Sequence, residues 1–289
     1  MQREMPEGGG RIAQDATFGV FTPEGKGVST ILAHPWRLGG GMAGLKAAAI
    51  SGVGTIPEYR RQGLLRSQMR LLFQDCRERG QAVATLSATQ SAIYQRYGYV
   101  QSVSNVQSYT IDTVDIGFVD GDTGSCTVRR QDPTPELVDE ALRPLYSDFI
   151  EGRSCAFAYD EGGDHTSARR VFISRTRGNS QFPVRIQHCA VARDASGQPR
   201  GYCLYRMVGD EPDINQSLDS FHAHARTPKH QTRFQKLVVY ELIWADLDAY
   251  RSLWSFLGKH DLVGELYWWN VPGDDPAQHI MLEPRLLHT

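Results

Sequence analysis

The segment GVGTIPEYRRQGLLRSQMRLLF, residues 52–73, contains residue types that could bind a phosphate group. Gly63 follows Arg60 and Arg61 where a run of small apolar residues gives way to an amphipathic segment. A glycine there turns the chain without a Cβ clash and leaves backbone N–H groups bare at the positive end of a helix, where a phosphate binds well. The arginines add charged donors beside those N–H groups. The segment therefore fits a diphosphate site, and an ordinary turn with solvated arginines fits it equally well.

Two common phosphate-binding motifs are absent from this segment. It has no GxxxxGK[ST] sequence, which excludes the nucleotide-binding P-loop, and no GxGxxG sequence, which excludes the dinucleotide fingerprint. Because the turn has a single glycine, a diphosphate would be bound by a short backbone arm.

The surrounding pattern predicts a strand, a turn and a helix. Residues 45–55 form a strand whose alanines and glycines indicate close approach by another backbone or a ligand. The apolar residues that follow repeat with the spacing of an amphipathic helix: Leu65, Met69, Leu72, Phe73 and Cys76. Gly80 supplies the residue that ends such a helix. A short strand at 82–87, a brief helix at 89–99 and a strand at 100–111 come next, so part of the sheet is predicted to be parallel or mixed.

Similar elements recur in the second half, which predicts two domains that share one fold. A hairpin over residues 17–33 precedes the first strand, and the Asp- and Gly-rich residues 112–125 are the predicted linker. The elements expected after it are strands at 126–130, 236–244 and 262–270, helices near 135–151, 165–177 and 247–257, and a hairpin around 193–201.

Composition excludes several function classes. The 289 residues carry a net charge of −2, which argues against a general nucleic-acid binder, and no apolar run is long enough for a membrane span. The first residues, MQREMPEGGG, lack the apolar stretch of a signal peptide. The five cysteines are scattered and form no CxxC motif, which is typical of a reduced, cytoplasmic protein.

Two stretches resemble a known family. VGTIPEYRRQGLLRSQM resembles motif A of the GCN5-related N-acetyltransferases (GNAT), whose pattern [R/Q]xxGx[G/A] corresponds to residues 60–65. Leu65 stands where glycine or alanine is usual, but PxxRRxGLL is similar to the enhanced intracellular survival (Eis-like) branch of the family. LSATQSAIYQRYGYV resembles a second stretch of that branch, and the two stretches lie about as far apart as they do there.

The resemblance implies an α/β (α+β) fold of two tandem GNAT-like domains, each a mixed, mostly antiparallel sheet flanked by helices. Residues 1–121 would be the catalytic domain and residues 122–289 a degenerate copy. It also implies that acetyl-CoA binds in the first domain, with its pantetheine arm on the backbone of residues 53–55 and its diphosphate on residues 61–66. The implied acetyl-CoA-binding residues are Val53, Gly54, Thr55, Arg60, Arg61, Gln62, Gly63, Leu64, Leu65, Arg66, Thr89 and Gln90.

A tyrosine supplies the chemistry that the resemblance implies. Acetyl transfer from a thioester to an amine needs a neutral amine, a stabilised oxyanion and a proton for the departing thiolate. A tyrosine hydroxyl can donate that proton. The family pattern YxxxG[FY] selects Tyr94 as the general acid, whereas Tyr97 and Tyr99 are expected to be core aromatic residues. A purely structural role for Tyr94 is the alternative.

No general base is assigned by the sequence. In the Eis-like family, the C-terminal carboxylate of a third, sterol-carrier-like domain is thought to fill this role, and this chain ends at EPRLLHT, where that domain would begin. We therefore expect the chain to be a fragment of a three-domain protein, and we expect this fragment to lack residues at both of its ends.

Other residue clusters favour structural roles. His222, His224 and His230 have spacing that zinc can use, but a polar loop is favoured and no metal is expected. The neighbours His188 and Cys189 would face opposite ways on a strand, so they are not a predicted catalytic pair.

The second domain is predicted not to bind acetyl-CoA. Asp246 and Asp248 lie at its strand–helix junction, where two carboxylates would repel a diphosphate. This domain would instead shape the acceptor cleft. Its tryptophans are expected in the core or at an interface: Trp244, Trp254, Trp268 and Trp269.

The sequence thus predicts an acetyl-CoA-dependent N-acetyltransferase. The acceptor would be a primary amine, on an aminoglycoside-like polyamine or on a lysine, and the resemblance implies a homo-oligomer. Two alternatives stay open: a non-catalytic acyl-CoA-binding relic of an Eis-like protein, and an unrelated α/β scaffold without a CoA site.

Overall fold

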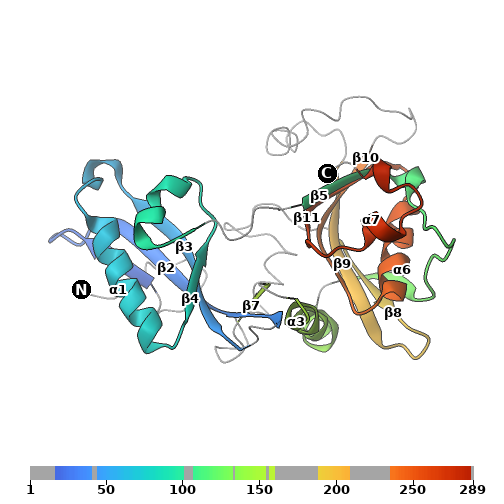
Figure 1. The fold of residues 1–289 in the computed structure, drawn as a ribbon, viewed down its shortest axis with the longest axis horizontal. Helices are drawn as coiled ribbons and strands as arrows, with labels where there is room; N and C mark the ends of the chain where they lie inside the picture. Colours follow the sequence, from blue (N-terminus) through green and yellow to red (C-terminus); the bar gives the residue numbers. More distant parts are fainter. Residues whose placement is uncertain are drawn as a thin grey trace. The chain divides into compact units, whose positions relative to one another are not determined.

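The computed structural model describes residues 17–40, 44–100, 107–132, 134–153, 156–159, 188–208 and 235–287. The chain forms two units, which Figure 1 shows with their labelled elements. Unit 1 comprises Met1–Ser102 and Ile150–Asp164, and unit 2 comprises Val103–Phe149 and His165–Thr289.

Unit 1 is built on a mixed sheet in the order β1-β2-β3-β4, with β7 also paired to β2. The strands are β1 (Thr17–Phe21), β2 (Gly27–Leu38), β3 (Lys46–Thr55), β4 (Val83–Leu86) and β7 (Phe157–Tyr159). β1 and β2 form the predicted antiparallel hairpin. β3 and β4 are parallel, and helix α1 (Leu64–Glu78) connects them, so the predicted mixed sheet is confirmed.

Helix α1 lies against one face of this sheet because its apolar residues form one stripe. Met69 and Leu72 are 1% and 0% exposed and pack against Ile31 of β2 and Ile50 of β3. The side chains of β2 and β3 alternate between the two faces of the sheet. Odd-numbered residues of β2 face the helix, and so do even-numbered residues of β3 up to residue 50. The other residues of these strands face away from the helix.

β3 has a bulge near its carboxyl end. Leu32 of β2 pairs with Ser51, but Thr30 pairs with Gly54, so β3 carries one extra residue between these pairs. Gly52 has a φ of 57°, and a Cβ atom there would lie 1.9 Å from Leu32 Cδ1. Only glycine fits this position without a rearrangement.

β3 and β4 separate at this bulge. Their parallel pairing ends at Ile50 and Leu86, whereas β3 continues to Thr55. Beyond Ile50, the edge of β3 toward β4 has no strand partner within the described part of the chain. We call this opening the β3–β4 fork.

Unit 2 contains a six-stranded sheet in the order β5-β11-β10-β9-β8-β6. Its strands are β5 (Gln107–Asp112), β6 (Thr127–Gln131), β8 (His188–Arg193), β9 (Pro199–Val208), β10 (Gln235–Trp244) and β11 (Val263–Val271). Only the β10–β11 pair is parallel, and helix α6 (Leu247–Gly258) connects it. The order β10–α6–β11 repeats β3–α1–β4, which agrees with the prediction of one repeated fold.

Shorter helices complete the two units. They are α2 (Pro135–Leu137), the π-helical η7 (Val138–Leu142), α3 (Arg143–Glu151), α7 (Ala277–Ile280) and the 3-10 turns η3 (Pro57–Tyr59), η4 (Ser91–Ile93), η5 (Gln95–Tyr97), η6 (Thr113–Asp115) and η8 (Pro284–Leu286). The brief helix expected at 89–99 is thus two 3-10 turns. The helix expected near 165–177 lies outside the described residues.

The units divide at a different point from the expected boundary after Gly121. The strand expected at 100–111 begins at Gln107 and pairs with β11 in the sheet of unit 2. The expected linker also belongs to unit 2, since Phe118 is buried and Thr113 Oγ1 donates a hydrogen bond of 2.6 Å to the carbonyl of Val263. These partners are far away in the sequence, so local composition did not indicate them.

In the part of the chain that the structure describes, no helix is long and apolar enough to cross a membrane.

Candidate functional site

The β3–β4 fork exposes the backbone that the sequence assigned to the pantetheine arm. Gly52 and Gly54 are exposed, and Val53 and Thr55 are half-buried. Val53 packs against the core under α1. With no strand partner on this edge and little side-chain cover, the backbone of residues 53–55 can accept hydrogen bonds from a ligand and donate to it.

The glycine turn, residues 60–66, connects the fork to α1. Gly63 is the N-cap residue of α1 and has a left-handed φ of 81°, and no side chain caps the helix. The first N–H groups of α1 therefore have no side-chain acceptor at the positive end of the helix dipole. The backbone of Arg61 is also left-handed, with a φ of 61°. Among the described residues, no other non-glycine residue has a positive φ. Turns that mix left- and right-handed residues form anion-binding concavities.

The arginines of the turn are exposed, in agreement with a role in binding. Arg60 Nε donates a hydrogen bond of 3.1 Å to the carbonyl of Thr55, which ties the turn to the end of β3. Arg61 and Arg66 are exposed beside the start of α1. Gln62 Nε2 instead donates to the carbonyl of Glu58, 3.2 Å away, and so stabilises the turn itself.

Leu65, which departs from the family pattern, faces the protein interior. Its half-buried side chain packs against the core cluster around Met69 and Leu72. Leu65 therefore lies on the core side of α1, where packing holds its side chain.

A buried polar network supports the turn and was missed in the sequence. Gln68 of α1 is 1% exposed; its Oε1 accepts from Ser29 Oγ at 2.7 Å and its Nε2 donates to the carbonyl of Phe18 at 3.1 Å. Ser29 Oγ also lies 2.8 Å from Thr55 Oγ1 and 2.9 Å from the carbonyl of Gly54. A glutamine within the apolar stripe of α1 was the available signal.

Tyr94 lies between the turns η4 and η5, after β4. Its ring is half-buried, packs against the core under α1 and meets Tyr99 edge-on at a centroid distance of 5.9 Å. Burial raises the pKa of the Tyr94 hydroxyl, so it carries its proton at neutral pH and can donate it. Thr89 and Gln90, the other implied residues after β4, are exposed.

Two other clusters were considered in the sequence, the histidines near residue 224 and the neighbours His188 and Cys189. Among the described residues, no three His, Cys, Asp or Glu side chains gather as potential metal ligands. His222, His224 and His230 lie outside the described residues. Cys189 is fully buried, which raises its pKa to about 12, so it is not a reactive thiolate.

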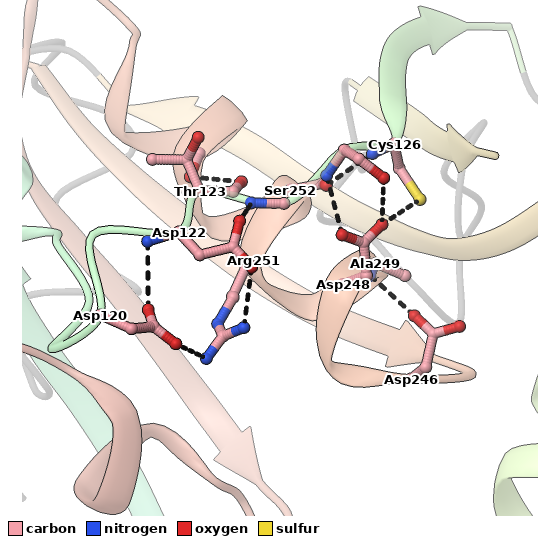
Figure 2. Close-up of polar contacts among 12 residues, drawn as sticks. Asp120, Asp122, Thr123, Cys126, Asp246, Asp248, Ala249, Arg251 and Ser252 are labelled. Carbon is pink, nitrogen blue, oxygen red and sulfur yellow. Dashed lines mark hydrogen bonds and ion pairs between the residues drawn. The ribbon is translucent and has the colours of Figure 1, made fainter. Parts of the chain in front are cut away.

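At the corresponding junction of unit 2, carboxylates occupy the helix start (Figure 2). Asp246 is the N-cap residue of α6, and its Oδ1 accepts from the Ala249 N–H at 2.9 Å, while Arg200 pairs with its Oδ2. Asp248 accepts from the N–H and Oγ of Ser125 at 2.8 and 3.0 Å. The helix start thus already has an acceptor and a negative charge.

Both halves of the chain match acetyltransferase families. Residues 3–101 and residues 169–289 each match a family described as "Acetyltransferase (GNAT) domain". The chain belongs to the GNAT acetyltransferases. This confirms the family and the tandem fold that the sequence predicted.

Relatives and solved structures agree with this assignment. Two proteins of Streptomyces avermitilis, both named "Uncharacterized N-acetyltransferase", are 28% identical to this GNAT protein over 85% and 98% of its length. Eis1 from Mycobacterium abscessus shares its fold with a TM-score of 0.69 and 22% identity over 94% of the chain, which supports the Eis-like resemblance at the level of fold. A GCN5-related N-acetyltransferase from Anabaena variabilis has a TM-score of 0.65 and 16% identity over 93% of the chain.

The chain is shorter than these proteins. It spans 54% and 63% of the length of the two Streptomyces relatives, and 60% and 59% of the Eis1 and Anabaena chains.

Proposed function

We propose that this protein is an N-acetyltransferase that moves an acetyl group from acetyl-CoA to a primary amine, and that the reaction takes place at the β3–β4 fork of unit 1. The observation that carries the proposal is the uncapped start of α1 beside the fork, in a domain that matches the GNAT family. Arg60 joins these two features through its bond to Thr55.

The residues present fit the co-substrate. The left-handed turn at Arg61 and Gly63 and the bare first turn of α1 would hold the diphosphate, with Arg61 and Arg66 as charged donors. The exposed glycines of the bulge let a pantetheine arm approach the β3 backbone. Leu64, Thr89 and Gln90 would line the rest of the site.

Two groups of the chain would act on the acetyl thioester that acetyl-CoA supplies. The backbone N–H of Val53 would donate to the thioester oxygen and stabilise the negative charge that develops there. The Tyr94 hydroxyl would protonate the departing sulfur, since burial keeps that hydroxyl protonated. Unit 2, whose helix start is capped by Asp246, would not bind acetyl-CoA there.

The acceptor would be a primary amine on an aminoglycoside-like polyamine or on a lysine side chain, and the family resemblance extends the proposal to a homo-oligomer. A cytoplasmic setting agrees with the four described cysteines, which form no disulfide: Cys76, Cys126, Cys189 and Cys203.

The test is calorimetric titration of the chain with acetyl-CoA and CoA. Wild type should bind both, and Arg61→Glu should abolish binding because it places a carboxylate beside the diphosphate. Arg77→Glu makes the same charge change near the other end of α1 and should keep the wild-type affinity. A folded wild type that binds neither ligand would refute the proposal.

A panel of amines then identifies the acceptor. Thiol release from acetyl-CoA should be detected with aminoglycosides, polyamines or lysine peptides, and Tyr94→Phe should suppress it. Tight acetyl-CoA binding without turnover of any amine would favour the non-catalytic relic.

A further inference from the structure

A histidine and a serine lie together at the fork and have no role in the mechanism above. His34 Nε2 of β2 is 2.8 Å from Ser51 Oγ of β3. His34 pairs directly with Ala49, so Ser51, two residues farther along β3, is its diagonal neighbour on the same face of the sheet. The His34–Ser51 pair is thus fixed by strand register.

Ser51 occupies the point where the fork opens. It is the first residue of β3 beyond the last β3–β4 pair, and it directly precedes Gly52 of the bulge. The proposed thioester-binding N–H of Val53 is two residues away in the chain. Ser51 is exposed, so a substrate that enters the fork can reach its hydroxyl.

The pair faces away from α1, whereas Tyr94 packs on the α1 side. Ile31 and Ala33 of β2 point into the core under α1, so His34 projects from the opposite face, as do Thr30 and Leu32. Thr30 Oγ1 donates to the carbonyl of Gly52 at 2.7 Å, which places the bulge on this face as well. An acid and a proton acceptor therefore lie on opposite faces of the fork.

His34 is suited to accept a proton at neutral pH. It is half-buried, and burial alone lowers the pKa of its imidazole, so the ring is neutral. The described residues of β1, β3 and β4 that share this face carry no ionisable side chain. The fourth neighbouring strand, β7, pairs with β2 farther along and places Tyr159 opposite Trp36.

We propose that His34 is the general base of the reaction and that Ser51 relays the proton to it. The inference rests on the proposed acetyltransferase function. An ammonium group of the acceptor gives one proton to Ser51 Oγ, while the Ser51 hydroxyl proton passes to His34 Nε2. The neutral amine then forms the C–N bond to the acetyl carbon.

The rest of the step balances the protons. As the C–S bond breaks, Tyr94 protonates the thiolate. The nitrogen of the adduct gives its second proton to water, and water returns a proton to the Tyr94 phenolate. His34 releases its proton to solvent, so each turnover releases one proton in total. The acceptor amine approaches from the His34 face, and the thiolate leaves toward Tyr94.

The test is the pH profile of acetyl transfer for wild type and His34→Gln, with the best amine of the panel. Wild-type kcat should fall as the pH drops through the pKa of His34, below its ordinary 6.5, because protonated His34 cannot accept a proton. His34→Gln keeps a hydrogen-bonding group but cannot titrate; it should lose this acid limb and lower kcat roughly 10²-fold or more. His188→Gln, which changes a histidine of unit 2 whose pKa burial also lowers, should keep the wild-type profile.

Binding and spectroscopy separate catalysis from folding. His34→Gln and Ser51→Ala should bind acetyl-CoA in calorimetry with the wild-type affinity within about threefold, since neither residue belongs to the glycine turn. Loss of binding in these variants would show a structural role and overturn the proposal, as would an unchanged rate and acid limb in His34→Gln. Failure of wild type to bind acetyl-CoA would instead refute the proposed function.

An acceptor-free measurement uses NMR of the histidine ring. The His34 resonances should titrate below 6.5 and shift on saturation with acetyl-CoA, because the pair lies at the fork. Resonances that stay unchanged by saturating acetyl-CoA would overturn the placement of His34 at the reacting end.

Discussion

The two units have the same strand–helix–strand core but different helix starts. β3–α1–β4 and β10–α6–β11 each pair two strands in parallel around one helix, and in each the pairing ends before the first strand does. The start of α1 has a left-handed glycine and no side-chain cap, whereas α6 starts at Asp246, which caps Ala249 and pairs with Arg200. The shared fold therefore supplies a fork, and the capping residue decides whether the helix start is open to an anion.

The difference also has a stability consequence. An Asp N-cap stabilises a helix by about 1 kcal/mol relative to Ala, and a left-handed non-glycine residue such as Arg61 costs about 1–2 kcal/mol. Unit 1 therefore gives up local stability at the glycine turn, while unit 2 uses its helix start for stability. Such departures from the most stable choice are expected at functional sites.

The largest effect should come from Tyr94 of unit 1, and a buried tyrosine of α6 in unit 2 serves as the comparison. Tyr94→Phe should lower kcat roughly 10²–10⁴-fold, because the thiolate loses its proton donor, and should leave acetyl-CoA affinity unchanged. Tyr250 of α6 is buried and donates to Asp275 at 2.9 Å, so Tyr250→Phe should lower the free energy of unfolding by about 1–3 kcal/mol. Steady-state kinetics and denaturant unfolding of both variants check this. A Tyr94→Phe protein with wild-type kcat would remove Tyr94 from the mechanism.

A carboxylate placed at the start of α1 should make unit 1 resemble unit 2. Gly63→Asp should weaken acetyl-CoA binding about 100-fold, because the new side chain competes for the first N–H groups of α1 and repels the diphosphate. Gly63→Asn is the matched control: it tolerates a left-handed φ and has a similar shape without the charge. In calorimetry, the acetyl-CoA affinity of Gly63→Asn should lie between those of wild type and Gly63→Asp. Equal losses in both variants would mean that backbone strain, and not charge, sets the affinity.

A buried carboxylate should make the stability of unit 2 fall as the pH rises through 6. Asp275 is 6% exposed, and burial raises its pKa to about 6 despite its bonds to Tyr250 and the Ala277 N–H. Because the folded pKa is above the unfolded one, this residue's contribution to stability is fully present below about pH 4 and is lost as the pH rises through 6.

The corresponding experiment compares wild type with Asp275→Asn. The wild-type free energy of unfolding, measured in urea, should lose about 2 kcal/mol between pH 4 and pH 7 relative to the variant. Parallel pH profiles for the two proteins would contradict the raised pKa.

The sequence predicted the parts of the site that depend on local patterns. The stripe containing Met69 and Leu72 gave α1, and the arginines and Gly63 gave the turn before it, because helix periodicity and turn residues are read over a few positions. The role of Tyr94 rests on a motif of similar length and stays a prediction.

Features set by distant contacts could not be predicted in this way. The His34–Ser51 pair depends on the β2–β3 register. A shift of one residue in this register would place the two side chains on opposite faces of the sheet. The division of the units depends on the pairing of β5 with β11, which are separated by most of unit 2 in the sequence. Neither pairing leaves a periodic signal in its own strand.

The smallest effect should come from removing the cap of unit 2. Asp246→Ala should lower the free energy of unfolding by about 1 kcal/mol, since Ala249 N–H loses its acceptor and Arg200, which is 41% exposed, loses only a solvent-screened partner. Asp248→Ala is the comparison variant, because it removes a neighbouring carboxylate that bonds Ser125 and does not cap the helix. Neither variant should give unit 2 an acetyl-CoA site, because it would still lack the arginines and the left-handed turn that precede α1. A second acetyl-CoA equivalent bound by Asp246→Ala in calorimetry would show that the cap alone separates the two units.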